Sequence, residues 1–431
     1  MTVIDGFVEE VDETAVPQAL RRPVHAILAS LVGRHKLKLG ELQSRLGRGH
    51  RPARLAGCAP PWPRATGPAR PDWSWTAASR PSAPRRPPEN RLGPAFGDWG
   101  LSLQLSGNSP TGHGEQVYLF LAGSPHLDQA FRRDAPRRIG GGGMTLPLNA
   151  DGAELNPEFT VSDTHAQGPI PVLSTHGRLY RASMNLNVPV PVPAPGSTTA
   201  KVTGELVDEL ESFPAFGIVQ SHDRLAVMRA SLAWNGEVLG SGVSASVTAS
   251  KGMAAFGSRT RTDGGDPLSR GSDPQFSSLQ GTLGVTQPLP FAAYVNLTVH
   301  AQTAFNQVLP SSETFGLTGN DALSTYSEGA INADGGITVR AQLERQWVRR
   351  VGRLALAATP YIYVASGQAW LTVPDDSTAQ RATAYGLGLR FAGKNFPWGG
   401  SPTFTLEYGH TDQDRGVPPR ERLYASLGMA F

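Results

Sequence analysis

The chain ends on the stretch ERLYASLGMAF, residues 421–431, in which apolar residues alternate with small or polar ones. One face of this stretch carries Leu423, Ala425, Leu427, Met429 and Phe431. A repeat of two residues is the side-chain period of a β-strand, whose neighbouring side chains point to opposite faces of a sheet. The sequence therefore predicts that the chain ends on a strand with two unlike faces and an aromatic last residue, Phe431.

The same alternation recurs upstream of this strand. It is clearest in YVNLTVHAQ (294–302), GITVRAQLE (336–344), TAYGLGLRF (383–391) and TFTLEYGHT (403–411). From Asp98 onward we count roughly fifteen or sixteen such segments of about 9–12 residues, a length and pattern typical of outer-membrane barrel strands. Arg, Glu, Gln, Asn and His at strand centres favour a wet lumen, although a soluble sandwich or propeller also exposes polar faces. We predict an all-β fold, an antiparallel transmembrane barrel of about sixteen strands.

The composition of the chain limits the classes of fold, partner and location that are possible. Hydrophobic residues make up 39% of the chain, with 49 Gly and 36 Pro, as expected for many short strands and turns. The net charge of +3 implies no nucleic-acid partner, and the single cysteine, Cys58, excludes an intrachain disulfide. Neither a spanning helix nor a signal peptide is visible, which alone would indicate the cytoplasm; the barrel pattern argues against that location.

Two N-terminal segments differ from the barrel pattern. Residues 1–46 resemble a small α/β unit, with a strand in TVIDGFVEEV and helical spacing in LRRPVHAILASLVG. Residues 47–89 form an anomalous linker; up to residue 88 they hold 10 Pro, 8 Arg and 8 Ala but no Val, Ile, Phe, Tyr or Lys. This linker could be disordered, a basic arm, or the product of a shifted reading frame.

One long stretch resembles a known family. SSETFGLTGNDALSTYSEGAINADGGITVRAQLER (311–345) is similar to the long loop and following strand of two-partner secretion translocators, the haemolysin activator/secretion group. VIDGFVEEV, NRLGPAFGDWGLSLQL, LPLNADGAEL and TPYIYVASGQAWL match other parts of the family in the family's order. The resemblance covers most of the chain outside residues 47–88.

The resemblance implies an architecture and a role. Family members carry periplasmic POTRA domains followed by a sixteen-stranded barrel, so we expect a partial POTRA module at 1–46 and an outer-membrane barrel at 90–431. It implies export of a large β-helical haemolysin or adhesin, with the exoprotein, outer-membrane lipid and the barrel-assembly machinery as partners. Because a signal peptide, a plug helix and a full first POTRA would precede Met1, we expect the N-terminus to be incomplete.

The resemblance also predicts a loop that reaches into the lumen. Its motif residues here are Leu323, Ser324, Thr325, Tyr326, Asp334 and Gly336. The family's motif Arg falls on Ser324, and the strand Asp that pairs with it falls on Ala365, near Gly367 on the expected contact strand. Losing both partners together can be near neutral, whereas losing one leaves an unpaired charge. We predict that other contacts hold this loop, through Tyr326 and Asp334, or that it is held loosely; a flexible external loop is the alternative.

No motif for catalysis emerges. The ten His residues show no H-E-x-x-H or H-x-H spacing, and there is no G-x-S-x-G. IGGGGMT (139–145) lacks the Lys-Ser/Thr of a phosphate loop and is predicted to be a strand start or a hairpin turn. We therefore predict no enzyme activity, no cofactor and no metal site. A passive porin-like channel and a non-functional truncated product are the alternatives to export.

Overall fold

The computed structural model describes most of the C-terminal four-fifths of the chain. The described residues are 84–85, 94–96 and 100–430, except 125–131, 133–134, 150, 168–169, 193–195, 261–264, 328, 353, 373–379, 395, 397–399 and 414–416. The predicted POTRA module, nearly all of the linker and Phe431 lie outside them. Within this described part, no helix has the length and hydropathy needed to cross a membrane.

One large antiparallel sheet makes up the described fold. Its 17 strands are β1 (Pro84–Arg85), β2 (Leu101–Asn108), β3 (Gln116–Gly123), β4 (Arg137–Pro147), β5 (Glu154–Ala166), β6 (Thr175–Val190), β7 (Ser197–Phe213), β8 (Ile218–Val238), β9 (Ser241–Met253), β10 (Ser277–Leu289), β11 (Ala293–Thr303), β14 (Gly335–Arg345), β15 (Trp347–Val351), β16 (Leu354–Trp370), β17 (Gln380–Lys394), β18 (Ser401–Gln413) and β19 (Val417–Ala430). β12 (Phe315–Gly316) and β13 (Asn332–Ala333) pair separately. Short 3-10 turns lie at η2 (Pro94–Phe96), η3 (Pro171–Leu173), η4 (Ser269–Gly271), η5 (Pro290–Ala292) and η6 (Ser311–Glu313).

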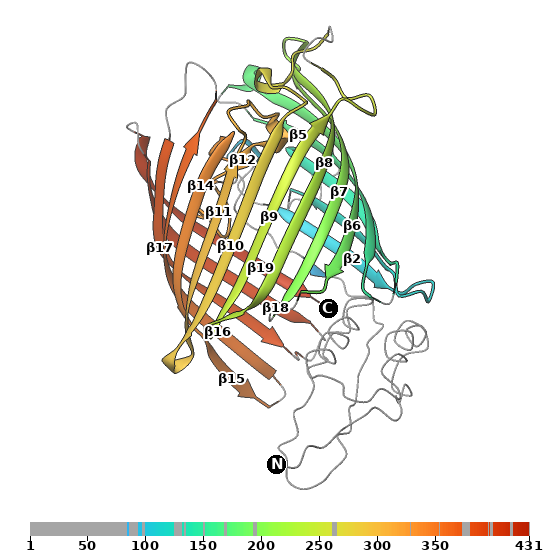
Figure 1. Ribbon diagram of the computed structural model, residues 1–431. Coiled ribbons are helices and arrows are strands. Elements are labelled where there is room, and N and C mark those ends of the chain that lie inside the picture. The colour runs from blue at the N-terminus through green and yellow to red at the C-terminus, as the bar shows by residue number, and fades with distance from the viewer. Residues whose placement is uncertain are drawn as a thin grey trace.

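The sheet curls into a barrel, as Figure 1 shows. Neighbours in the chain are neighbours in the sheet from β2 to β11 and from β16 to β19, and β11 pairs with β14. β14 and β15 both pair with β16 and are successive segments of one wall strand, so the 17 described strands form 16 wall positions. The short β1 pairs with β19, next to β2. The prediction of an all-β barrel of about sixteen strands is confirmed.

The two ends of the barrel differ in their connections. At the short-turn end, two residues join β8 to β9, and both have positive φ (Leu239 51°, Gly240 78°), as a tight hairpin turn requires. At the long-loop end, residues 254–276 join β9 to β10 and residues 304–334 join β11 to β14. Outer-membrane barrels keep short turns on the periplasmic side and long loops outside.

Alternate residues of each strand face opposite environments. On β16, Ile362 and Val364 are 58% and 57% exposed on the outer face, whereas Tyr361, Tyr363 and Ala365 are buried on the lumen side. On β14, Thr338, Arg340 and Gln342 are buried, opposite the exposed Ile337, Val339 and Leu343. The apolar outer face is the surface that lipid covers in such barrels. The predicted alternation is therefore confirmed for these strands.

One sequence interpretation needs correction. IGGGGMT lies within β4, which begins at Arg137, so the hairpin-turn alternative is wrong. A Cβ on Gly141 would come 2.4 Å from the Phe120 ring, and one on Gly143 would come 2.5 Å from the Tyr118 hydroxyl. These glycines stand where aromatic side chains from β3 lie across the neighbouring strand, and any larger residue would displace them.

Candidate functional site in the barrel lumen

The loop at residues 304–334, here called the lumen loop, folds back inside the barrel (Figure 1). Its two legs pair through β12 and β13, with Phe315 opposite Ala333. The buried cluster formed by the loop and the wall comprises Phe315, Leu317, Leu323, Ile331, Ala333, Tyr361, Tyr363, Ala365, Ala369, Ala382 and Ala384. Because the wall members belong to β16 and β17, the loop packs against the inner face of these two strands.

Small wall residues make room for the loop. A Cβ on Gly367 would lie 2.9 Å from the Leu317 side chain and 3.2 Å from that of Leu323. Leu317 and Leu323 are fully buried, and Ala365 is 1% exposed. The predicted contact residues on β16, Ala365 and Gly367, are thus brought together with the predicted motif residue Leu323.

The tip of the loop contacts a buried ion pair. Arg340 on β14 and Glu407 on β18 lie 3.1 Å apart, Nη2 to Oε2, and both are about 4% exposed. Ser324 lies between them: its hydroxyl donates to Glu407 Oε1 at 2.5 Å and accepts from Arg340 Nη1 at 2.6 Å. Arg340 also donates to the Ala322 carbonyl at 3.3 Å. The loop therefore presents a neutral hydroxyl to two charges of the wall.

Aromatic side chains enclose this ion pair. The Tyr361 hydroxyl donates to Glu407 Oε2 at 2.7 Å, and the Arg340 guanidinium lies 3.7 Å from the centre of the Tyr363 ring. The Tyr363 hydroxyl hydrogen-bonds to Thr325 Oγ1. A Cβ on Gly409 would lie 2.3 Å from both of these oxygens, so only glycine fits there. Because Arg340 and Glu407 are buried among these aromatic side chains, each charge-assisted hydrogen bond of the pair is strengthened.

The positions of the two charges differ from those that the family resemblance predicted. Arg340 is the direct partner of Ala365 in the β14–β16 ladder. The resemblance predicted an Arg on the loop at 324 and an Asp on the wall at 365. The structure instead places an Arg on the wall beside residue 365, and it places the acid two strands further on, at Glu407.

The base of the lumen loop is held by a second ion pair. Asp334 is fully buried and receives a two-pronged contact from Arg270 at 2.6 and 3.0 Å. The backbone N–H groups of Leu309 and Thr372 each donate to its carboxylate at 2.8 Å. Burial favours the neutral acid, but these hydrogen bonds outweigh it and hold the pKa of Asp334 below its usual value. The Asp334 carboxylate therefore connects three segments at the long-loop end: the 254–276 loop through Arg270, the lumen loop itself, and the residues that follow β16 through Thr372.

The other predicted motif residues make simpler contacts. The Tyr326 hydroxyl donates to the Asp412 carbonyl at 3.0 Å. Gly336 begins the ladder of β14, where a Cβ would lie 2.6 Å from the Phe315 ring. The contacts of Tyr326 and Asp334 are those that the sequence proposed as holding the loop; their role in gating stays a prediction. Phe431 lies outside the described residues.

The opposite wall binds the same loop. Glu313 in η6 accepts from Arg229 on β8 at 2.6 Å, and Arg229 also contacts Glu205 on β7 at 3.3 Å. The Ser311 N–H donates to Ser269 Oγ of the 254–276 loop at 2.9 Å. The lumen loop thus bridges two sides of the barrel, and the second long loop fastens it at the long-loop end.

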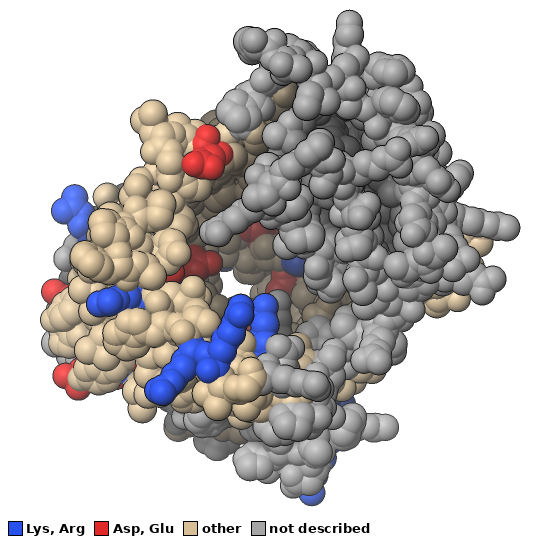
Figure 2. Space-filling view, turned by 90° about the horizontal axis from the view of Figure 1, so that it is seen from below, with Lys and Arg blue, Asp and Glu red and all other residues tan. Residues whose placement is uncertain are grey.

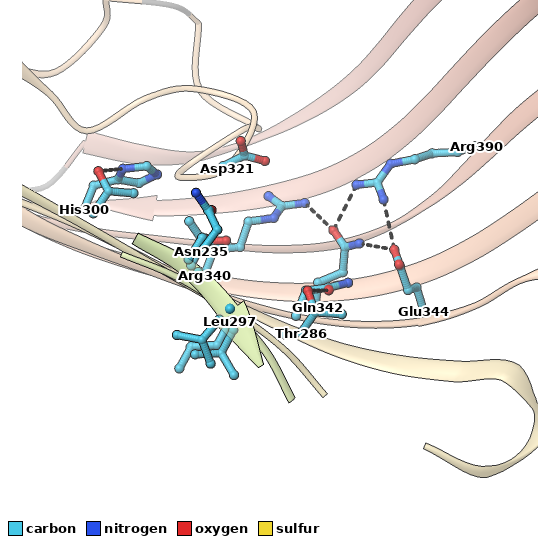
Figure 3. A pocket seen from close by; sticks show the side chains of 18 residues that line it. Asn235, Thr286, Leu297, His300, Asp321, Arg340, Gln342, Glu344 and Arg390 are labelled. Atoms are coloured by element: carbon cyan, nitrogen blue, oxygen red, sulfur yellow. Dashed lines mark hydrogen bonds and ion pairs between the residues drawn. The ribbon is translucent and has the colours of Figure 1, made fainter. Parts of the chain in front are cut away.

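Below the loop tip the lumen is polar. A cavity of about 600 Å³ is lined by wall residues of β8 to β11, β14 and β17 together with the loop. Figure 3 shows Arg340, Gln342, Glu344 and Arg390 joined in a chain, with Arg390 3.2 Å from Gln342 Oε1 and 3.0 Å from Glu344 Oε2. Seen from the short-turn end, the barrel is hollow, with charged side chains around the hollow (Figure 2). These groups suit a water-filled passage.

Sequence reasoning missed the wall residues that hold the loop. Arg340 and Glu407 were visible as charges on the polar faces of their strands, which is the only signal that the sequence offers for them. The sequence prediction of no metal site rested on the absence of H-E-x-x-H and H-x-H spacing, and it did not consider Asp163 and His165, which strand pairing brings beside His176.

Residues 195–391 match the family model of haemolysin secretion/activation proteins ShlB/FhaC/HecB. Among solved structures, CdiB from Escherichia coli is similar with a TM-score of 0.79 at 16% identity, covering 99% of this chain and 76% of CdiB. CdiB from Acinetobacter baumannii matches with a TM-score of 0.65 at 12% identity, covering 99% of this chain and 73% of that one. BamA from Haemophilus ducreyi lacking POTRA domains 1–3 gives 0.55 at 12% identity, with 96% and 81% covered. Comparison with curated protein sequences found no significant match.

Proposed function

We propose that this chain, whose residues 195–391 match the family model of haemolysin secretion/activation proteins, is an outer-membrane translocator that exports a large secreted protein of the β-helical haemolysin or adhesin type. The barrel would be the export path across the outer membrane. The short-turn end would face the periplasm and the long-loop end the outside. The exported protein is the partner that this proposal requires.

The observation that carries the proposal is the way in which the lumen loop is held. Its tip binds the wall through Ser324, while both charges of the ion pair, Arg340 and Glu407, belong to the wall. When the loop leaves, Arg340 and Glu407 keep each other as partners. Removing the loop therefore exposes no unpaired charge at the tip, which suits a plug that has to move for a passing chain.

In this proposal, the exoprotein is bound before it enters the lumen and is pulled forward after it leaves. The predicted partial POTRA module at 1–46 would bind the unfolded exoprotein by adding a strand to its sheet edge. The polar groups beneath the tip, including Gln342, Glu344 and Arg390, would solvate the moving chain. Folding of the exoprotein outside would pull it forward, because the sequence predicts no nucleotide site.

Conductance of the full chain in planar bilayers tests this proposal. An exporter gives currents that the N-terminal domain of its exoprotein blocks selectively, whereas an unrelated unfolded protein of equal length does not. Steady currents that neither protein affects would favour a passive porin-like channel. A chain that fails to insert into outer membranes would instead be a non-functional product, and a detergent-independent soluble monomer would contradict the barrel itself.

A further inference from the structure

A cluster of metal-binding residue types lies outside the lumen, on the β5–β6 hairpin. Asp163 and His165 are two residues apart on β5 and so share a face, and His176 on β6 is the direct ladder partner of His165. The same faces carry Phe159 and Tyr180, which are 49% and 46% exposed on the outer surface. Because β5 ends at Ala166 and β6 begins at Thr175, the cluster lies at the long-loop end of the barrel.

The distances within the cluster are those of ligands around one ion. His165 Nδ1 and His176 Nε2 lie 3.3 and 3.5 Å from Asp163 Oδ1, and one ligand atom from each residue lies within 4.8 Å of the others. Two ligands of a tetrahedral Zn²⁺, each bonded at about 2.0–2.1 Å, are roughly 3.3–3.4 Å apart. The imidazole rings stack with centroids 4.3 Å apart and an interplanar angle of 14°; because a ring nitrogen binds a metal in the plane of its ring, at least one ring must rotate out of this stack when the two share an ion.

Two of these ligand atoms have unused bonding capacity. Asp163 Oδ1 and His176 Nε2 are shielded from solvent, and neither has a hydrogen-bond partner. Buried polar atoms usually have such a partner, and the exceptions call for a physical reason. A cation between them would satisfy both atoms at once.

Neighbouring groups orient the cluster. Arg138 on β4 lies 3.2 Å from Asp163 Oδ2, which turns the other carboxylate oxygen toward the histidines. The Arg138 contact fixes the orientation of the carboxylate, as outer contacts do in metal sites. Without a metal, His165 Nδ1 donates a hydrogen bond to the Ala135 carbonyl oxygen at 3.2 Å. An ion would replace the proton of this bond and bring the same carbonyl within reach as a further ligand.

We propose that Asp163, His165 and His176 bind a divalent transition-metal ion of the Zn²⁺ type, with the Ala135 carbonyl or a water at the fourth position. Imidazole nitrogen and carboxylate oxygen are ligands that Zn²⁺ accepts, and a rigid sheet holds them in place. The ion would fasten β5 to β6 at the outer surface, independently of the lumen loop and of export.

Calorimetric titration of ZnCl₂ into the metal-stripped full chain in detergent tests this site. Cys58 is first replaced by Ser so that its thiol cannot bind the metal. We expect one site of micromolar or tighter affinity, with His176→Gln weakening binding at least 100-fold. His222→Gln is the matched control, because His222 also contacts carboxylates, Asp208 at 3.0 Å and Asp266 at 3.5 Å, but no second imidazole lies beside it among the residues that the structure describes.

Thermal unfolding of the same proteins guards against a folding defect. Zn²⁺ should raise the Tm of the parent chain and of the His222 variant but not that of the His176 variant, while the metal-free Tm values stay close together. Ligand binding to the folded state alone produces such a shift. Absence of binding to the parent chain, or equal binding by both variants, would overturn the proposal and would indicate a plain Asp–His ion pair.

Discussion

The two attachment points of the lumen loop are built in opposite ways. At the tip, Arg340 and Glu407 both belong to the wall, and the loop contributes only the hydroxyl of Ser324. At the base, the charges of Asp334 and Arg270 belong to two different loops. Moving the tip breaks the hydrogen bonds between the neutral Ser324 hydroxyl and the two charged wall residues. Moving the base separates the Asp334–Arg270 ion pair and leaves a buried carboxylate without its partner.

This difference gives the two ends of the loop different tasks. The base fixes where the loop enters the lumen, because Asp334 also collects N–H groups from Leu309 and Thr372. The tip is the end that can be released at lower cost. The resemblance predicted a loop Arg paired with a wall Asp, an arrangement in which release leaves two unpaired charges. Because both charges belong to the wall, their ion pair persists whether the loop is docked or displaced, and the stability of the barrel does not depend on the position of the loop.

The largest expected effect comes from breaking the wall ion pair. Glu407→Ala leaves Arg340 buried without its carboxylate and should lower the free energy of unfolding by about 3–5 kcal/mol. Urea unfolding in detergent, followed by tryptophan fluorescence, measures this. Thr405→Ala, on the same face of β18, is the control and should change little. The double variant Arg340→Met with Glu407→Met should be more stable than Glu407→Ala, and a double variant that is less stable would contradict the account.

Removing the charge at the base should have the next largest effect. Asp334→Ala removes the carboxylate partner of Arg270 and of two backbone N–H groups, and leaves Arg270 with the Leu309 carbonyl; we expect a cost of about 2–3 kcal/mol in docking of the loop. We expect higher and noisier conductance in planar bilayers and faster proteolysis of the loop. Asp321→Asn, an exposed carboxylate of the same loop, is the matched control. If both variants conduct alike, the base contact does not hold the loop.

Releasing only the tip should be milder. Ser324→Ala removes the hydroxyl from the ion pair but leaves Arg340 and Glu407 in contact, so we expect a loss of about 1.5 kcal/mol in docking of the loop. Conductance should then rise while urea unfolding of the barrel stays close to that of the parent chain. Ser327→Ala removes the next serine hydroxyl of the loop, which accepts from Arg422 at 3.0 Å and does not touch the ion pair, and it serves as the comparison. A Ser324 variant that unfolds as readily as Glu407→Ala would show that tip and wall are not separable.

The sequence predicted the barrel well because lipid and lumen impose a period of two on every strand. Ile337, Val339 and Leu343 had to be apolar, and Thr338, Arg340 and Gln342 polar, whatever the details of packing. It also predicted the lumen loop and the two residues of β16 beneath it. It could not predict the ion pair, because Glu407 lies 67 residues from Arg340 and only the strand register brings them together. For the same reason the sequence left open whether the glycines of β4 form a strand start or a hairpin turn, since the rings that need them come from β3.

The smallest expected effect is a pH dependence at the second wall contact. Burial raises the pKa of Glu313 to about 7, with Arg229 opposing the shift. Because this pKa lies above the ordinary value of 4.5, the folded protein binds this proton more tightly than the unfolded chain does. The linked stability is therefore fully present below about pH 4.5, and it is lost as the pH rises toward 7 and above.

We expect the Tm of the parent chain to fall more between pH 5 and pH 8 than that of Glu313→Gln, which keeps a hydrogen bond to Arg229 but has no proton to lose. Glu237→Gln, in an exposed position at the short-turn end, should retain the slope of the parent chain. The base contact adds nothing in this window, because the lowered pKa of Asp334 keeps it ionised there. Equal slopes for the parent chain and Glu313→Gln would mean that Arg229 keeps Glu313 charged throughout, and that this side of the loop is held by a permanent ion pair, as its base is.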